Sequence, residues 1–150
     1  MSTGPSVPEA VRTLLLLMPR VVGRLKRTPV PETLRSLDLA PRHLSLLSYL
    51  IFDGPLTVTG LAERLEVAPT TVSLMVSELS RKGVVERRED DSDRRRTIVS
   101  IAPAHQDAVN AWLAKGVRAW SRAVEPLTPE QRRMFIETLQ VYERELSAGE

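Results

Sequence analysis

The segment Leu61–Ile101 constrains the fold most, because two helical patterns separated by a short break are followed there by a basic hairpin pattern. Apolar residues with helical spacing begin at Leu61, and Glu66–Ala68 interrupts them before Pro69. Proline is favoured in the first turn of a helix, so a second helix is predicted from Pro69 onward. This segment therefore predicts a helix-turn-helix.

The predicted second helix has two different faces. One face is apolar at the spacing i, i+3, i+4, i+7 and is expected to be buried: Val72, Met75, Val76 and Leu79. The opposite face carries mostly short hydroxyl side chains: Thr70, Thr71, Ser73, Leu74 and Ser77. Hydroxyl groups can reach base edges and phosphates in a major groove, and Leu74 can pack on thymine methyl groups. We therefore predict a DNA recognition helix, with Arg81 and Lys82 as further contacts near its end.

A β-hairpin is predicted after this helix. Gly83 supplies a stop signal, and Val84–Arg88 and Thr97–Ile101 are short runs rich in β-branched residues. The residues between them, 89–96, are too polar to be buried and are expected to form an exposed wing loop. The loop supplies three predicted DNA contacts: Arg94, Arg95 and Arg96. We expect Asp91 or Asp93 to brace one guanidinium group while Arg94 or Arg95 enters a minor groove.

Four segments together resemble the MarR family of transcriptional regulators: Leu61–Leu65, Thr71–Ser73, Leu79–Arg87 and the wing motif Asp90–Arg95, which is similar to the family's D-x-x-D-R-R signature. The resemblance implies a mainly α-helical winged helix-turn-helix with a two-stranded β-wing. It also implies a homodimer formed by interleaved N- and C-terminal helices. A small-molecule effector would bind between the winged domain and those helices.

The sequence departs from the family pattern at four positions. Leu74 and Glu78 stand where the family often has basic residues, and Glu78 would repel a phosphate if it faced the DNA backbone. Replacing Glu78 with arginine is then expected to tighten binding to any DNA. Ala68 lacks the capping side chain usual before this helix, a loss of about 1 kcal/mol. Glu66 stands where glycine is common in the turn, so a strained backbone is expected there.

Amphipathic helices are predicted on both sides of the winged domain, the first with a bend or break near Pro19 and the last with a capping box that begins at Thr128. Their apolar faces are either intramolecular core or, for the helices together, a dimer interface. The predicted organisation is a disordered arm (1–8), an N-terminal dimerisation helix (9–35), the DNA-binding domain (36–102) and C-terminal dimerisation helices (103–147).

Candidate effector contacts follow from the resemblance: Leu17, Val21, Arg42, His43, Leu47, Ile51 and Trp112. Packing in an ordinary core is the alternative interpretation for the apolar ones. Arg42 and His43, at the start of a predicted helix, could meet an anionic or phenolic group, although polar residues there are usually solvated.

Composition restricts the remaining function classes. The chain has no cysteine, which excludes disulfides and a cysteine-based redox switch, and its two histidines have no partner at metal-ligand spacing. We expect no metal, no cofactor and no enzymatic activity. The longest apolar run, Leu14–Met18, is too short to cross a membrane, so a cytoplasmic protein is expected.

The sequence thus predicts a homodimeric repressor that binds a palindromic operator in double-stranded DNA and responds to a small lipophilic or aromatic effector. Two alternatives stay open. A winged helix with an altered recognition face can serve as a protein-interaction module, which Leu74 and Glu78 favour and the arginine wing opposes. A constitutive DNA-binding protein without ligand control is the other.

Overall fold

The computed structural model describes residues 3–149, which are mainly helical with one small antiparallel sheet. The elements in chain order are α1 (Val7–Lys26), α2 (Glu32–Arg35), α3 (Pro41–Asp53), β1 (Leu56–Thr57), α4 (Val58–Leu65), α5 (Pro69–Arg81), β2 (Val85–Asp90), β3 (Asp93–Ile101), α6 (Pro103–Val124) and α7 (Pro129–Ser147). They form two compact units, Met1–Leu113 and Ala114–Glu150. Of the helices between residues 3 and 149, none is long and apolar enough to cross a membrane.

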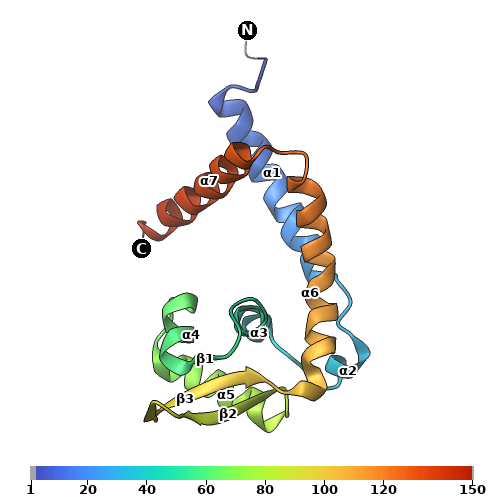
Figure 1. Ribbon diagram of the computed structural model, residues 1–150. Helices are drawn as coiled ribbons and strands as arrows, with labels where there is room; N and C mark the ends of the chain where they lie inside the picture. The colour runs from blue at the N-terminus through green and yellow to red at the C-terminus, as the bar shows by residue number, and fades with distance from the viewer. Residues whose placement is uncertain (1–2, 150) are drawn as a thin grey trace. The chain divides into compact units, whose positions relative to one another are not determined.

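The first unit contains the winged helix-turn-helix domain, in which α3, α4 and α5 lie beside the sheet (Figure 1). One apolar core joins these elements: Leu34, Leu46, Leu47, Leu50, Leu61, Ala62, Val72, Met75, Val76, Leu79, Val84, Val85, Val99, Ile101 and Val109. Leu34 of α2 is fully buried in this core, although residues 9–35 were predicted to form a dimerisation helix. The core of the winged domain therefore extends beyond the predicted range 36–102 at both ends.

The turn between α4 and α5 has the backbone that the sequence predicts. Glu66 adopts a left-handed conformation (φ 54°), and the amide of Val67 donates to the carbonyl of Ala62 (3.2 Å), which closes the end of α4. A left-handed residue other than glycine is strained, so the expected strain at Glu66 is confirmed. α5 then begins at Pro69 and is followed by Gly83 in the left-handed region (φ 75°).

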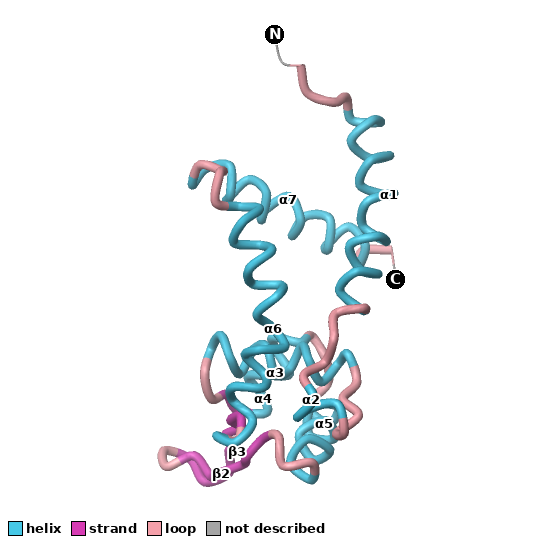
Figure 2. The backbone as a smooth tube through the Cα atoms, turned by 90° about the vertical axis from the view of Figure 1, so that its right-hand side faces the viewer, coloured by secondary structure: helices cyan, strands magenta, loops and turns pink. Residues whose placement is uncertain are grey.

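The sheet contains the predicted two-stranded wing and one further strand. Its order is β1-β3-β2, and β1 pairs Leu56 with Val99 and Thr57 with Ile98. Sequence reasoning did not find β1, because two residues are too short to show the alternating pattern that marks a strand. Figure 2 shows the β2–β3 hairpin extending away from the helices.

Helix α1 starts earlier than predicted and is not interrupted. Ser6 is its N-cap residue, and the amide of Ser6 donates to Glu9 Oε2 (2.8 Å), so Val7 and Pro8 of the predicted disordered arm form the first turn. Residues 1–2 of that arm lie outside the described residues. Of the predicted bend or break at Pro19, the break is wrong, because the helix continues through this residue, and the bend stays a prediction. Proline removes the donor to the carbonyl four residues earlier, and water can satisfy that group at exposed Leu15.

The second unit is a helical hairpin made by the end of α6 and by α7. The predicted capping box is confirmed: the Thr128 amide donates to Gln131 Oε1 (2.8 Å), and the Gln131 amide donates to Thr128 Oγ1 (3.2 Å). Trp120 and Phe135 pack with ring centroids 5.7 Å apart. No residue of α1 or α7 that the structure describes is buried.

Candidate nucleic-acid interface

One face of α5 is buried and the opposite face is exposed, as predicted. Val72, Met75, Val76 and Leu79 are buried in the core. The outer face is exposed at Thr70, Thr71, Ser73, Leu74 and Arg81 and half-buried at Ser77. Leu74 stands out on this face, because its side chain is apolar and yet 67% exposed. The structure therefore brings six of the predicted DNA contacts to one accessible surface.

The start of α5 has no side-chain cap, as predicted. Ala68 is the N-cap residue in an extended conformation (φ −64°, ψ 144°), and no side chain accepts a hydrogen bond from the first turn. The carbonyl of Ala68 accepts from the amides of Thr71 (3.0 Å) and Val72 (3.3 Å). The missing acceptor is therefore a property of the alanine side chain and does not reflect a displaced helix start.

Glu78 is the principal correction to the sequence analysis. It would repel phosphate if it faced the DNA backbone, whereas its carboxylate is directed to α3 and lies 2.8 Å from His43 Nε2 and 3.3 Å from Arg42. The hydrogen bond from His43, followed by that from Arg42, lowers the pKa of the Glu78 carboxyl. On a helix of 3.6 residues per turn, position 78 lies on the flank beside the buried Met75, which explains why it faces another helix.

The ring of His43 connects the start of α3 to α5. His43 is 3% exposed, and its Nδ1 accepts a hydrogen bond from the amide of Ala40 (3.0 Å). Because an N–H already points at Nδ1, the ring proton is assigned to Nε2, which donates to Glu78. His43 and Arg42, predicted as effector contacts, are thus engaged with the recognition helix.

Lys82 is also engaged inside the domain. Its Nζ donates to the carbonyls of Leu37 and Asp38, the second at 3.0 Å. Asp38 has a left-handed backbone (φ 49°), so the ammonium group holds a strained turn before α3. The prediction that Lys82 contacts DNA stays untested. Among the described residues, its ammonium group binds the loop at Leu37 and Asp38.

The wing is longer than the sequence predicts. β2 and β3 continue to Asp90 and from Asp93, and the tip is closed by Asp90 Oδ1, which accepts from the amide (3.0 Å) and hydroxyl (2.8 Å) of Ser92. The three arginines therefore belong to β3 and not to a loop. The pairing passes from Glu89 with Thr97 directly to Asp90 with Asp93, so residues 94–96 form a bulge opposite β2. A bulge re-aims side chains and permits the hairpin to carry adjacent arginines.

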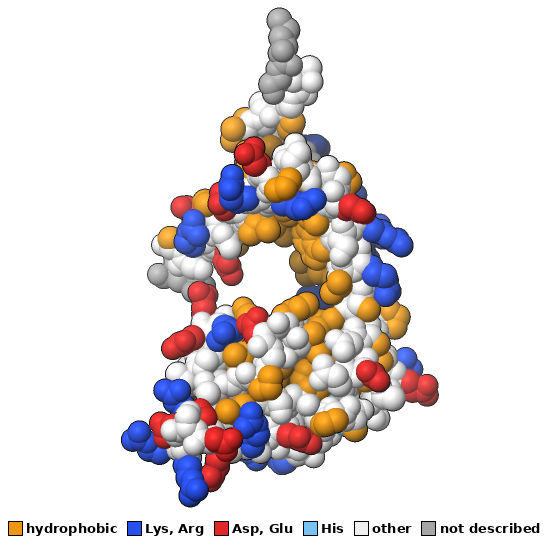
Figure 3. Space-filling view, in the orientation of Figure 1, with side chains coloured by type: hydrophobic (Ala, Val, Ile, Leu, Met, Phe, Trp, Pro, Cys, Tyr) orange, Lys and Arg blue, Asp and Glu red, His pale blue; other side chains and the backbone are white. Residues whose placement is uncertain are grey.

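Asp93 braces one arginine of the wing, as predicted. Asp93 Oδ1 accepts from the amide and from Nε of Arg95, both at 3.1 Å, and Oδ2 lies 3.8 Å from Arg96 Nε. These bonds, first that from the Arg95 side chain, lower the pKa of the Asp93 carboxyl. Within residues 3–149, Arg94 is exposed and makes no ion pair. Figure 3 shows basic and acidic side chains crowded at the lower left, where Figure 1 places the hairpin.

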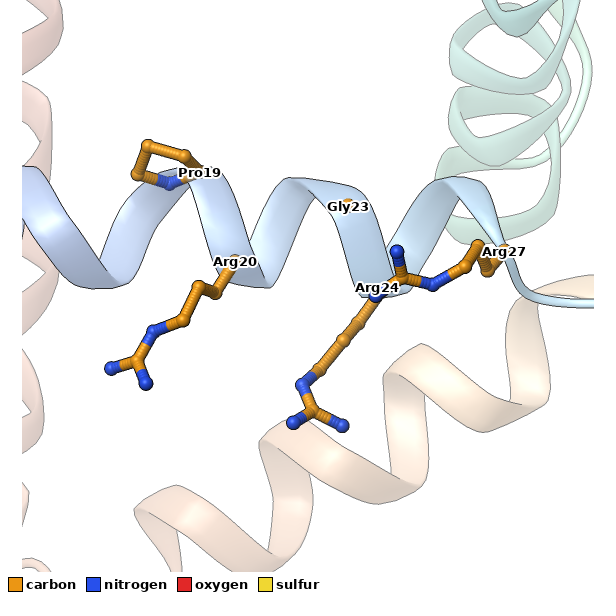
Figure 4. Close-up of a pocket in the computed structure, with 5 residues that line it drawn as sticks. All are labelled: Pro19, Arg20, Gly23, Arg24 and Arg27. Atoms are coloured by element: carbon orange, nitrogen blue, oxygen red, sulfur yellow. The ribbon is translucent and has the colours of Figure 1, made fainter.

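The predicted effector contacts do not line a described pocket together. Leu47 is fully buried in the core, Ile51 and Trp112 pack against that core, and Leu17 and Val21 lie on α1. A surface depression of about 340 Å³ lies instead along α1, where Arg27 reaches back over Gly23 (Figure 4). Its lining is Pro19, Arg20, Gly23, Arg24 and Arg27. The effector site therefore stays a prediction.

Comparison with known proteins agrees with this geometry. The sequence profile of the MarR family matches residues 37–96. The HTH-type transcriptional repressor MdtR of Bacillus subtilis is 32% identical over 104 residues, which cover 67% of each chain.

Two solved structures share the fold across most of the chain. S. aureus MepR in its DNA-binding conformation has a TM-score of 0.65 at 22% identity and covers 87% of this chain and 96% of its own. The PcaV regulator of Streptomyces coelicolor, in complex with its natural ligand, has a TM-score of 0.60 at 18% identity and covers 99% of this chain and 100% of its own. With its profile match, its relative at 32% identity and its winged helix-turn-helix, the chain belongs to the MarR family of transcriptional regulators.

Proposed function

We propose that this regulator is a homodimeric repressor that binds a palindromic operator and releases it when a small lipophilic or aromatic molecule binds. The observation that carries DNA binding is the combination, in one small domain, of the exposed outer face of α5 and a hairpin whose Arg94 makes no ion pair with any described residue. Nothing in the packing of the domain requires exposed hydroxyl and guanidinium groups at these positions.

The proposed DNA contacts have different tasks. Residues on the outer face of α5 enter the major groove, and the wing enters the adjacent minor groove. Because Asp93 holds the Arg95 guanidinium, we assign the minor groove to Arg94 and phosphate contacts to Arg95 and Arg96. Lys82 contributes through the loop that it holds.

Dimerisation is supported by apolar side chains that the single chain leaves exposed. On α1, eight leucine, valine and methionine side chains between Val11 and Leu25 are exposed or nearly so: Val11, Leu14, Leu15, Leu16, Leu17, Met18, Val22 and Leu25. On α7, exposed apolar residues include Met134, Phe135, Ile136 and Leu146. So many exposed apolar side chains on one helix are typical of an interface. A two-fold dimer would present two recognition helices to half-sites separated by about 10 bp.

Oligomeric state can be tested with one variant and a matched control. Ile136→Glu places a charge on the exposed apolar surface of α7, whereas Gln140→Glu adds the same charge on the same helix at a position that is already polar. Sedimentation velocity should show a dimer for the wild type and for Gln140→Glu, and a shift towards monomer for Ile136→Glu. A monomeric wild-type protein would contradict the proposal.

Repression and effector release rest on the relatives. MdtR is named as a repressor, and the PcaV structure contains a natural ligand. An in vitro selection from random duplexes, followed by gel shifts with competitor DNA, tests operator binding. Failure to enrich any duplex would favour a protein-interaction module, for which the exposed Leu74 is the supporting observation. Effector release is tested by adding aromatic carboxylates and hydrophobic drugs to the protein–DNA complex in the gel shift. A complex that none of these compounds dissociates would favour constitutive binding.

A further inference from the structure

We propose that Leu74 reads thymine: its side chain contacts the C5-methyl group of a thymine in the major groove and makes recognition depend on that methyl. This inference rests on the proposed DNA-binding function and adds the chemical feature of DNA that α5 selects. Three observations about the surface of α5 carry it.

The first observation is the place of Leu74 on the helix. The other large apolar side chains of α5 are buried, whereas Leu74 is 67% exposed on the opposite side. At 3.6 residues per turn, Leu74 lies near the centre of the outer face, one turn from both Thr70 and Ser77. A docked recognition helix would therefore bury Leu74 against the base edges.

The second observation is the chemistry that surrounds Leu74. Guanine is read most often by arginine or lysine, and adenine by asparagine or glutamine. The helix from Pro69 to Ser80 contains none of these four residue types. Arg81 is the last residue of α5, and its Nε bends back to the Ser77 carbonyl (3.4 Å). The side chains left on α5 to read bases are thus hydroxyl groups and the isobutyl group of Leu74. The apolar group that a base pair presents in the major groove is the thymine methyl.

The third observation is the position of Glu78, one turn after Leu74. A free carboxylate there would repel the phosphates that flank the groove. His43 and Arg42 hold this carboxylate on the α3 side of the helix. Leu74 can therefore approach the bases without carrying an unpaired negative charge with it.

The experiment removes only the methyl group. A duplex enriched by in vitro selection is synthesised with each thymine replaced in turn by deoxyuridine, which retains base pairing and the O4 acceptor. Affinities are measured by fluorescence anisotropy for the wild type, for Leu74→Ala and for the control Phe52→Ala, which removes an equally exposed apolar side chain outside α5. Alanine is a strong helix former, so Leu74→Ala is expected to fold.

At least one thymine-to-deoxyuridine change per half-site should weaken wild-type binding about fourfold, the factor that corresponds to one buried methyl group. Phe52→Ala should keep this discrimination, whereas Leu74→Ala should bind both duplexes equally. The role of Leu74 would be overturned if Leu74→Ala still bound the thymine duplex more tightly than the deoxyuridine duplex. It would also be overturned if no replacement changed the affinity of the wild type. Either result would leave DNA binding intact. If selection enriches no duplex, the proposed function itself fails.

Discussion

Replacing His43 with leucine tests the link between α3 and the recognition helix. The buried ring accepts from the Ala40 amide and donates to Glu78, and leucine fills a similar volume without either hydrogen bond. A neutral hydrogen bond contributes about 1 kcal/mol and one to a charged group about 1.5–3 kcal/mol. Because the Glu78 side chain is 32% exposed and keeps Arg42, part of the loss is recovered. We expect the free energy of unfolding to fall by about 2–3 kcal/mol.

The assay is urea unfolding followed by circular dichroism at one fixed chain concentration, because the proposed dimer would make stability depend on concentration. His105→Leu is a matched control, since the Nδ1 atom of His105 is buried and accepts no hydrogen bond from the described residues. This control should keep or raise stability, because it removes an unsatisfied polar atom. Equal midpoints for His43→Leu and the wild type would refute the assigned role of His43, as would an equal loss in both histidine variants.

Three further outcomes are expected. Arg94→Ala should weaken operator binding tenfold or more, about 1–3 kcal/mol, and more than Arg95→Ala does; equal anisotropy curves for wild type and Arg94→Ala would exclude this arginine from the groove. Ala68→Ser should supply the missing cap and raise the free energy of unfolding by about 0.5–1 kcal/mol, and a lower melting temperature would contradict the helix start. Because the pKa of the Glu78 carboxyl lies below its usual 4.5, its contribution to stability is present above that pH and is lost as the pH falls through the lowered value. The free energy of unfolding of Glu78→Gln should therefore fall less steeply than that of the wild type as the pH is lowered from 7. An equal fall in both proteins would contradict this.

The helix-turn-helix could be predicted because local signals and packing agree there. Pro69 and Gly83 mark both ends of the recognition helix, and its apolar spacing identifies the buried face. That Asp91 or Asp93 braces a wing arginine could also be predicted, because acidic and basic side chains are close neighbours in this short segment. The choice of Asp93 and Arg95 could not be predicted, because it depends on the bulge at residues 94–96.

The contacts that sequence reasoning missed join segments distant along the chain. Glu78 and His43 are 35 positions apart, and Lys82 lies 45 positions from Leu37, so no periodic pattern relates them. A glutamate on the flank of a recognition helix gives the same sequence signal whether it faces phosphate or another helix. Burial of Leu34 was missed for a similar reason, because one turn of helix in α2 is too short to show a period.

The most direct test of the account is the affinity ratio between a selected palindromic duplex and a scrambled duplex of equal composition, measured by anisotropy at physiological salt. A protein that binds DNA only through its phosphates would bind both duplexes equally, whereas base readout by α5 and the wing distinguishes them. We predict that two chains bind the palindrome about a thousandfold or more tightly than they bind the scrambled duplex. Equal affinity for both duplexes would contradict the claim that this winged domain reads a DNA sequence.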